Sequence, residues 1–429
     1  MKLKAVLVGC GDRTCVYTNF MVNEFQEVEV VAAVDPNIER RKFVHEHFNV
    51  PLDKCYSDIQ EVLTQGKIAD FVVNGTMDPL HVATSIPFLE QGYDMLLEKP
   101  ITNNEKDLLK LASVAKERNC KLMICHVLRF SPFYREIKKT ILSGEIGNVI
   151  NIDTTERVGA YHSSVSYLRG KWNSEAKCGS SLLLAKCCHD IDLIAWFNNN
   201  TRPTIIYSEG KRDYFNEENA PKGSGNRCMV DCPKEIKDKC MYDAEYMYIK
   251  NDLLPWYPWQ CTGKNYQDLT LEEKIESLKK DNPHGRCVYK CGGDLLNHQH
   301  VNIQFSNGSS ACHTLILGAV KADRTIHVVG TKGEIEGSVS SGKLYIRTYN
   351  KETAGYNERK VNFNETKGET GGHFGGDKGL VKDFLSYLRD DEPSVSTTVI
   401  EDSLISHLVI YDADKSIIKG EPVPFDHKI

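Results

Sequence analysis

The sequence predicts an α/β protein in which a doubly wound parallel sheet is followed by a second, mixed α+β domain. Short apolar runs alternate with amphipathic helical stretches over the first 125 residues, and this alternation is typical of a parallel sheet with right-handed crossovers. After residue 126, helical segments mix with strands of alternating hydrophobicity. Because 429 residues exceed one typical domain, we expect two domains, at residues 1–126 and 127–429.

Each element is expected from its own hydrophobic pattern. In the first domain, buried apolar runs predict strands at residues 3–8, 28–34, 71–74, 95–97 and 122–125. Apolar residues three and four apart predict helices there at residues 39–47, 81–91 and 106–117. In the second domain we expect helices at 133–142, 182–197, 378–388 and 403–415, and strands at 301–305, 311–317 and 325–329.

Composition excludes several classes of protein. The 53 Lys and Arg against 59 Asp and Glu give a net charge of −6, which argues against a general nucleic-acid or membrane-surface binder. No apolar run is long enough to span a membrane, and the apolar stretch at residues 3–8 is too short for a signal peptide. We therefore expect a cytoplasmic protein. Its 15 cysteines then point to metal binding, catalysis or burial rather than disulfides.

A glycine-rich loop follows the first strand. Gly9 and Gly11 fit a Rossmann fingerprint, in which the backbone turns tightly and then approaches a dinucleotide pyrophosphate at a helix N-terminus. Asp12 and Arg13 open that helix, so we include both in the cofactor site. Thr14 occupies the place of the third glycine. The alternative is a glycine-rich turn without a ligand.

The next strand strengthens the cofactor hypothesis. Asp35 ends it, 24 residues after Gly11, where an acid accepts hydrogen bonds from an adenosine ribose. This carboxylate favours NAD, because it would repel the 2′-phosphate of NADP, although Arg40 and Arg41 lie close in sequence. We also place in the NAD site two residues that follow the strand at 71–74, namely Thr76 and His81.

A second signature, Glu98-Lys99-Pro100, follows the strand at residues 95–97. Alone it would be an ordinary solvated turn. With the glycine loop and Asp35, it makes the chain resemble the glucose–fructose oxidoreductase/inositol dehydrogenase/rhizopine-catabolism (Gfo/Idh/MocA) family. The resemblance implies that Lys99 lies beside the nicotinamide and the substrate hydroxyl, with Glu98 in the cofactor site. It also implies an open, mostly antiparallel sheet in the second domain, through which a homodimer or homotetramer forms.

The family's second motif is a helix with a histidine, an aspartate four residues before it and another three residues after. Residues 179–196 supply His189 and Asp192, but Ala185 replaces the first acid. Lys186 lies on the adjacent turn, and helical spacing lets Lys186 and His189 face one cleft. A structural, hydrogen-bonded role is the alternative for His189.

These residues suit the oxidation of a secondary alcohol, which loses a hydride to nicotinamide and a proton to a base. We assign Lys99 and His189 jointly to the proton. Lys186 binds the substrate hydroxyl or lowers the pKa of Lys99 by its charge. Candidate substrate-binding residues are Tyr161, Arg169, Trp172, Asp190 and His373.

A cysteine-rich insertion is expected at about residues 210–297. Cys228, Cys232, Cys240 and Cys287 have spacings near those of a structural zinc site, and reduced or buried thiols are the alternative. Cys187 and Cys188, beside His189, raise the alternative of a cysteine nucleophile.

Three functions remain open. The first is an NAD-dependent oxidoreductase acting on a secondary hydroxyl of a sugar, polyol or sugar derivative. The resemblance also implies two alternatives: an NAD-dependent glycosidase that works by transient oxidation and elimination, and a dinucleotide-binding regulator without turnover. Retention of both Lys99 and His189 counts against the regulator.

Overall fold

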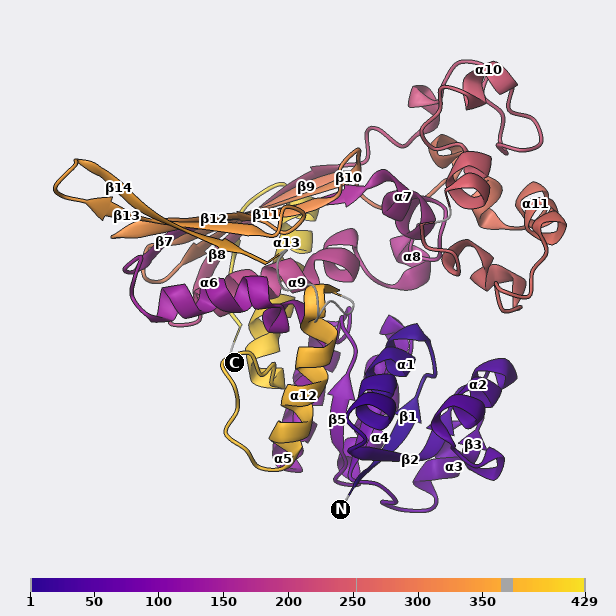
Figure 1. The fold of residues 1–429 in the computed structure, drawn as a ribbon, viewed down its shortest axis with the longest axis horizontal. Coiled ribbons are helices and arrows are strands. Elements are labelled where there is room, and N and C mark those ends of the chain that lie inside the picture. The colour runs from indigo at the N-terminus through magenta and orange to yellow at the C-terminus, as the bar shows by residue number, and fades with distance from the viewer. Residues whose placement is uncertain (1, 252, 364–372, 428–429) are drawn as a thin grey trace.

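Two sheets organise the protein (Figure 1). The structure, a computed structural model, describes residues 2–251, 253–363 and 373–427. The first sheet has six strands in the order β3-β2-β1-β4-β5-β6, and the second has nine in the order β14-β13-β12-β11-β7-β10-β9-β8-β15. The predicted fold class is thereby confirmed.

The six-stranded sheet is parallel throughout. Its central strands are buried on both faces, as a parallel sheet between helical layers requires. The strands are β1 (Leu3–Val8), β2 (Val28–Val34), β3 (Cys55–Tyr56), β4 (Phe71–Asn74), β5 (Asp94–Leu97) and β6 (Leu122–Ile124). The helices are α1 (Asp12–Asn19), α2 (Ile38–Phe48), α3 (Ile59–Leu63), α4 (His81–Glu90) and α5 (Glu105–Glu117).

Side-chain caps fix where several of these helices begin. Asn37 accepts a hydrogen bond from the backbone of Glu39 at the start of α2. Asn104 does the same for the first turn of α5. Asp58 and Glu61 form a capping box on α3, a helix that the hydrophobic pattern did not predict because it is only five residues long.

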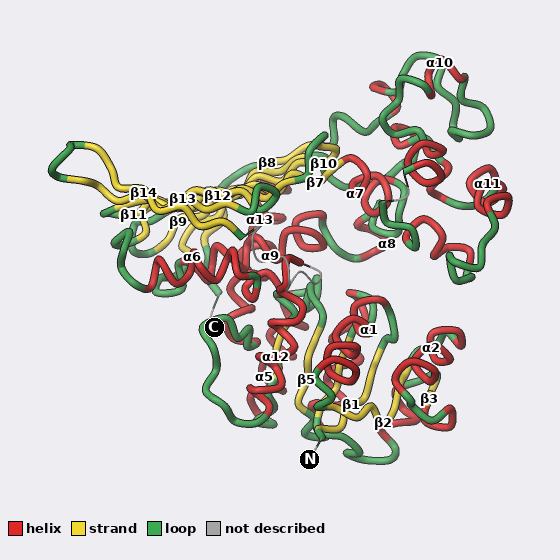
Figure 2. Tube along the Cα trace, in the orientation of Figure 1, coloured by secondary structure: helices red, strands yellow, loops and turns green. Residues whose placement is uncertain are grey.

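The nine-stranded sheet is antiparallel except where β7 pairs with β10. Helices α6, α9 and α13 cover one face of it (Figure 2). The strands are β7 (Val149–Gly159), β8 (Pro203–Lys211), β9 (His298–Phe305), β10 (Ser310–Ala319), β11 (Asp323–Gly330), β12 (Gly333–Ser338), β13 (Lys343–Asn350), β14 (Gly355–Asn362) and β15 (Val423–Pro424). The helices of this half are α6 (Pro132–Leu142), α7 (Ala160–His162), α8 (Glu175–Cys178), α9 (Leu182–Phe197), α12 (Gly376–Leu388) and α13 (Ile400–Lys419).

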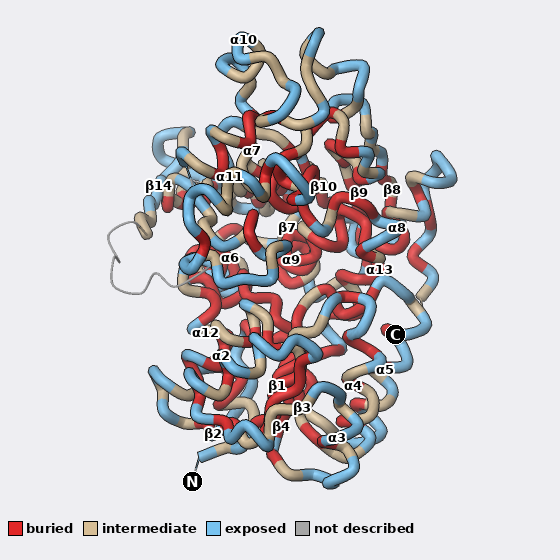
Figure 3. Tube along the Cα trace, turned by 90° about the vertical axis from the view of Figure 1, so that its right-hand side faces the viewer, coloured by how far each residue is buried: buried red, intermediate tan, exposed pale blue. Residues whose placement is uncertain are grey.

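The insertion projects from the end of the nine-stranded sheet beyond β8. Among its described residues are the short α-helices α10 (Lys234–Lys237) and α11 (Leu271–Lys279). Figure 3 shows that buried segments concentrate in the two sheets and α9, while much of the chain around α10 is exposed. Among the described residues, no helix has the length and apolar composition needed to cross a membrane.

Helix α12 belongs to the second half in sequence but packs on the parallel sheet in space. Leu380 and Phe384 are fully buried in one core with residues of β1 and β4. The ring of Phe384 lies 5.2 Å from that of Phe71 in an edge-on arrangement. The start of α12 is thereby brought to the carboxyl edge of the parallel sheet, close to α1.

Candidate active site

The glycine loop has the geometry of a pyrophosphate cradle. Gly9 has a φ of +77°, and a Cβ there would lie 2.7 Å from the backbone nitrogen of Thr76. Gly11 is extended and precedes α1 without a side-chain cap, and a Cβ built on Gly11 would meet nothing within 4 Å. The loop thus leaves space beside Gly11 at the N-terminus of α1, which suits an anion.

Thr14 compensates for the missing third glycine. Its buried hydroxyl donates to the carbonyl of Gly9 at 2.6 Å. Gly75, after β4, leaves the space that this hydroxyl occupies. The close packing of loop and helix is therefore provided by a glycine on a different strand, which the sequence motif does not include.

Asp35 lies at the end of β2, where the adenosine ribose is expected. One carboxylate oxygen accepts from the backbone of Cys10 at 2.9 Å and the other from that of Asn37 at 2.8 Å. Arg40 pairs with the same carboxylate at 3.4 Å and is half exposed. Asp35 is therefore held rigidly against the glycine loop.

Thr76 and His81 join the loops that follow β4 and β5. The two ring nitrogens of His81 lie 2.7 Å from the carbonyl of Pro100 and 3.0 Å from that of Thr76. The hydroxyl of Thr76 donates to Asn74 at 2.9 Å. His81 is buried, so its geometry favours positioning of these loops rather than direct contact with a cofactor.

Glu98 connects the cofactor helix to Lys99. One carboxylate oxygen accepts from Arg13 at 3.1 Å and from the Tyr17 hydroxyl at 2.6 Å, and the other accepts from the backbone of Lys99 at 2.9 Å. Burial alone would raise the pKa of Glu98, but the charges of Arg13 and Lys99 and these hydrogen bonds hold it below its usual value. Glu98 is an ionised anchor for the strand end that carries Lys99.

Lys99 reaches across to α9. Its Nζ donates to the backbone carbonyl of Ala185 at 3.1 Å, at the position where the family motif has an acid. His189 lies one turn further along α9 and is 5 % exposed, and its Nδ1 has no hydrogen-bond partner within the described part of the chain. Burial, together with the charge of Lys99, holds the pKa of His189 well below its usual value.

Lys186 faces a carboxylate that the sequence analysis did not identify. Its Nζ lies 3.2 Å from Glu156 of β7. Arg324 of β11 lies 2.8 Å from the same Glu156 and 2.9 Å from Asp190. The charge of Lys186 is thus balanced by a neighbour, and Asp190 is engaged by an arginine.

Asp192, three residues after His189 on α9, pairs with an arginine. It forms a two-point ion pair with Arg129, with both distances at 2.7 Å, and both side chains are buried. Asp192 therefore anchors α9 to the chain that follows β6.

Two of the candidate substrate-binding residues, Trp172 and Tyr161, pack against other aromatic rings. Trp172 is half-buried and lies between the rings of Tyr167 and Tyr257, at 6.5 and 6.4 Å. The ring of Tyr161 packs edge-on against Tyr248. Aromatic residues that follow β7 thus pack against aromatic residues of the insertion.

Arg169 has a different environment from the one we expected. It is fully buried and donates to the backbone carbonyls of Arg286 and Tyr242 at 2.6 and 2.7 Å, and to Ser164 at 2.8 Å. Because carbonyl and hydroxyl groups of the protein accept the hydrogen bonds of this guanidinium, the geometry favours a role in holding the insertion in place rather than in binding a sugar.

The cysteines of the insertion do not assemble as metal ligands. Cys228, Cys232, Cys240 and Cys287 line one small cavity, but no three of them bring their sulfur atoms together within the described residues. Arg169 also donates to Cys228 at 3.4 Å, so a cation already faces these thiols. The donor set does not fit a zinc ion, and all 15 cysteines are free thiols.

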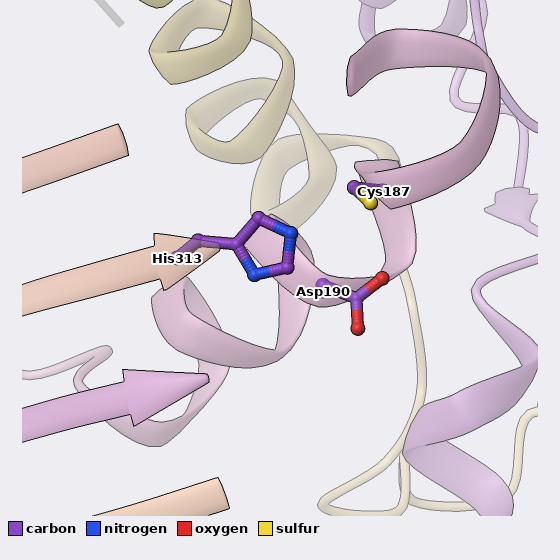
Figure 4. Close-up of side chains that lie close together, drawn as sticks. All are labelled: Cys187, Asp190 and His313. Carbon is purple, nitrogen blue, oxygen red and sulfur yellow. The ribbon is translucent and has the colours of Figure 1, made fainter. Parts of the chain in front are cut away.

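One other group of metal-type ligands occurs among the described residues: Cys187, Asp190 and His313, which lie close together where α9 crosses β10 (Figure 4). Asp190 is engaged by Arg324 there, whose charge opposes a metal cation. Burial raises the pKa of Cys188 to about 12 and that of Cys187 well above its usual value. Buried neutral thiols argue against a cysteine nucleophile.

The chain is similar in sequence to known oxidoreductases. Residues 3–126 match the profile of the Gfo/Idh/MocA oxidoreductases, described as an oxidoreductase family with an NAD-binding Rossmann fold. The oxidoreductase YteT of Bacillus subtilis (strain 168) is 25% identical over 324 residues, which cover 74% of this chain and 72% of that protein. Inositol 2-dehydrogenase of Corynebacterium glutamicum (strain R) is 23% identical over 195 residues, or 45% of this chain and 53% of the enzyme.

Solved structures share the fold over the whole length. The WlbA dehydrogenase from Bordetella pertussis, in complex with NADH and UDP-GlcNAcA, has a TM-score of 0.68 at 15% identity and covers 100% of this chain and 99% of its own. The scyllo-inositol dehydrogenase from Lactobacillus casei, with NAD(H) and scyllo-inositol, has a TM-score of 0.66 at 17% identity, with 100% of both chains covered. The resemblance that the two motifs indicated is confirmed.

Proposed function

We propose a substrate class and proton-transfer groups for this chain, an NAD-binding oxidoreductase of the Gfo/Idh/MocA family. It transfers a hydride between the nicotinamide and a secondary hydroxyl of a sugar, polyol or sugar derivative. The observation that carries the proposal is the 3.1 Å contact of Lys99 with Ala185. This contact joins the end of the cofactor strand to the helix of His189. Relatives named as inositol dehydrogenases support the substrate class.

The chain's own groups suit the binding of NAD. Gly9 provides the tight turn against Thr76, Gly11 leaves space for a pyrophosphate at the start of α1, and Asp35 is fixed where a ribose hydroxyl can donate to it. NAD would supply the hydride acceptor. Zinc is not part of this proposal, because neither candidate set of ligands fits it.

Lys99 and His189 act on the substrate hydroxyl. The ammonium of Lys99 stabilises the negative charge that develops on the oxygen, and His189, neutral because of its burial, accepts the proton. Lys186, held by Glu156, orients the hydroxyl or adjusts the charge around Lys99. Trp172 and Tyr161 offer apolar faces on which a sugar ring can stack.

A second candidate is the redox-neutral glycosidase. One observation favours it: Gln260 of the insertion donates to Asp12, the first residue of α1, at 3.2 Å. The insertion therefore contacts the helix start at which a pyrophosphate would bind. A cofactor that this contact helps to retain would exchange slowly, which suits a cycle that returns the hydride to the same sugar.

The test is incubation of the purified protein with sugars, polyols and aryl glycosides, with and without added NAD. Net formation of NADH supports the dehydrogenase. Release of the aglycone without net NADH supports the glycosidase. No reaction over a broad panel, with NAD still bound, would overturn both and leave the regulator.

A further inference from the structure

His189 has two imidazole neighbours, and they differ in their access to water. The ring of His126 lies 5.7 Å from that of His189, and the ring of His373 lies 6.0 Å away. His126 is fully buried, and neither of its ring nitrogens has a hydrogen-bond partner among the described residues. The side chain of His373 is 37 % exposed. Of these two neighbours, His373 is the one whose side chain is open to solvent.

His373 is oriented by a buried carboxylate. Its Nδ1 lies 3.1 and 3.3 Å from the two oxygens of Asp377. Asp377 is fully buried in the first turn of α12. A histidine that donates from Nδ1 to a carboxylate keeps Nε2 available as a proton acceptor.

Asp377 is in turn held by the cofactor helix. Arg13 binds both of its oxygens, at 2.6 and 3.2 Å. The same guanidinium binds Glu98, which precedes Lys99. Arg13 therefore fixes Asp377 and the strand end of Lys99 together, although these segments lie far apart in sequence.

The backbone around His373 is strained. His373 and Phe374 have φ values of +53° and +58°, and Gly375 follows at +84°. Side-chain residues seldom adopt this left-handed conformation, and two in succession persist only where surrounding contacts over-determine them. Such strain is concentrated at functional sites. Here the conformation directs His373 toward His189.

We propose that His373, oriented by Asp377, is a relay residue that carries the substrate proton from His189 to solvent. The inference rests on the proposed function. When the alcohol is oxidised, the C–H electron pair leaves as hydride for the oxidised nicotinamide cofactor. The O–H bond breaks, and its electron pair forms the second carbon–oxygen bond of the ketone. The proton passes to His189, then to Nε2 of His373 through one bridging hydroxyl or water, and finally to bulk water.

The test uses His373→Gly, because glycine accepts the positive φ and leaves room for added imidazole. We expect kcat to fall about 100-fold with the substrate KM changed less than about twofold, and imidazole to restore kcat at least about tenfold. The matched control is His298→Ala, which removes another exposed histidine paired with an aspartate, Asp213 at 3.3 Å, away from the site. It should change neither value. A raised KM with unchanged kcat, or a loss of kcat that imidazole does not restore, would overturn the relay.

A second measurement separates this inference from the proposed function. If the wild-type protein turns over nothing on the panel, the proposed function and the relay that depends on it both fail. The orientation of His373 is then judged by ¹⁵N NMR of its ring. We expect the Nδ1–H tautomer in the wild-type protein and its loss in Asp377→Asn. The same tautomer in both proteins would show that Asp377 does not orient His373.

Discussion

Lys186 on α9 and Glu156 on β7 form an ion pair at 3.2 Å, whereas the sequence predicted that Lys186 binds the substrate hydroxyl or lowers the pKa of Lys99. Both side chains are largely buried, and Glu156 also receives Arg324 at 2.8 Å. Removal of one partner from a buried pair leaves a desolvated charge, which is strongly destabilising. The position of Lys186 therefore depends on a strand that precedes α9 by more than twenty residues.

We predict that Glu156→Gln lowers the free energy of unfolding by about 3 kcal/mol, because two buried cations lose a countercharge. Urea denaturation measures this change. Glu276→Gln is the control, since Glu276 forms only exposed pairs with Lys279 and Lys280, and it should cost less than about 1 kcal/mol. Equal effects of the two substitutions would contradict the structural role of Glu156.

The two loop glycines should respond differently to alanine. Gly9→Ala places a Cβ against the backbone of Thr76 at a φ of +77°, so we expect a loss of about 2 kcal/mol or more in unfolding free energy. Gly11→Ala meets open space in the protein and should fold normally. Its Cβ enters the region where the pyrophosphate would approach, so NAD should bind at least about tenfold more weakly. Calorimetric titration with NAD checks this, and normal binding by Gly11→Ala would place the cofactor elsewhere.

Local patterns were sufficient for much of the fold. The helix predicted at residues 182–197 occurs with those bounds, since Ser181 caps its start and apolar residues dominate its length. Strand β14 was not predicted because most of its residues are exposed and it is held by pairing with β13. Its sequence therefore has little apolar alternation to detect.

Local motifs predicted some residues of the candidate site, and tertiary packing brought in others. The glycine loop, Asp35 and Lys99 could be proposed as site residues because each lies at a strand end with a recognisable local motif. Glu156 could not, because only tertiary packing brings it to Lys186. Arg169 resembled a sugar-binding residue in sequence, but the insertion buries it. The contact of Asp377 with Arg13 joins residues 364 positions apart, so it appears only in the folded chain.

We predict that the buried, neutral His407 makes the protein less stable in mild acid. Burial lowers the pKa of His407 to about 3, and its Nε2 accepts from the backbone of Ile101 at 2.9 Å, which a protonated ring cannot do. Unfolded histidine titrates near 6.5. As the pH falls through that value, the unfolded chain binds a proton that the folded chain does not, so folding weakens. For His407 this loss amounts to about 2 kcal/mol between pH 7 and pH 5.

Urea denaturation at pH 7 and pH 5 measures this effect. In His407→Gln, the difference in unfolding free energy between the two pH values should be smaller than in the wild type by about 2 kcal/mol. An unchanged difference in His407→Gln would show that His407 is protonated in the folded protein.

The proposed division of roles predicts that Lys99→Ala and His189→Ala each lose turnover while keeping NAD. Lys99 stabilises the developing negative charge and His189 takes the proton, so kcat for the substrate found on the panel should fall about 10²- to 10⁴-fold in each variant. Neither side chain is needed for the glycine loop or for Asp35, so the dissociation constant of NAD should change little. Lys106→Ala, an exposed lysine at the start of α5, should behave as the wild type. Near wild-type turnover in both site variants would show that the proton leaves by groups other than Lys99 and His189.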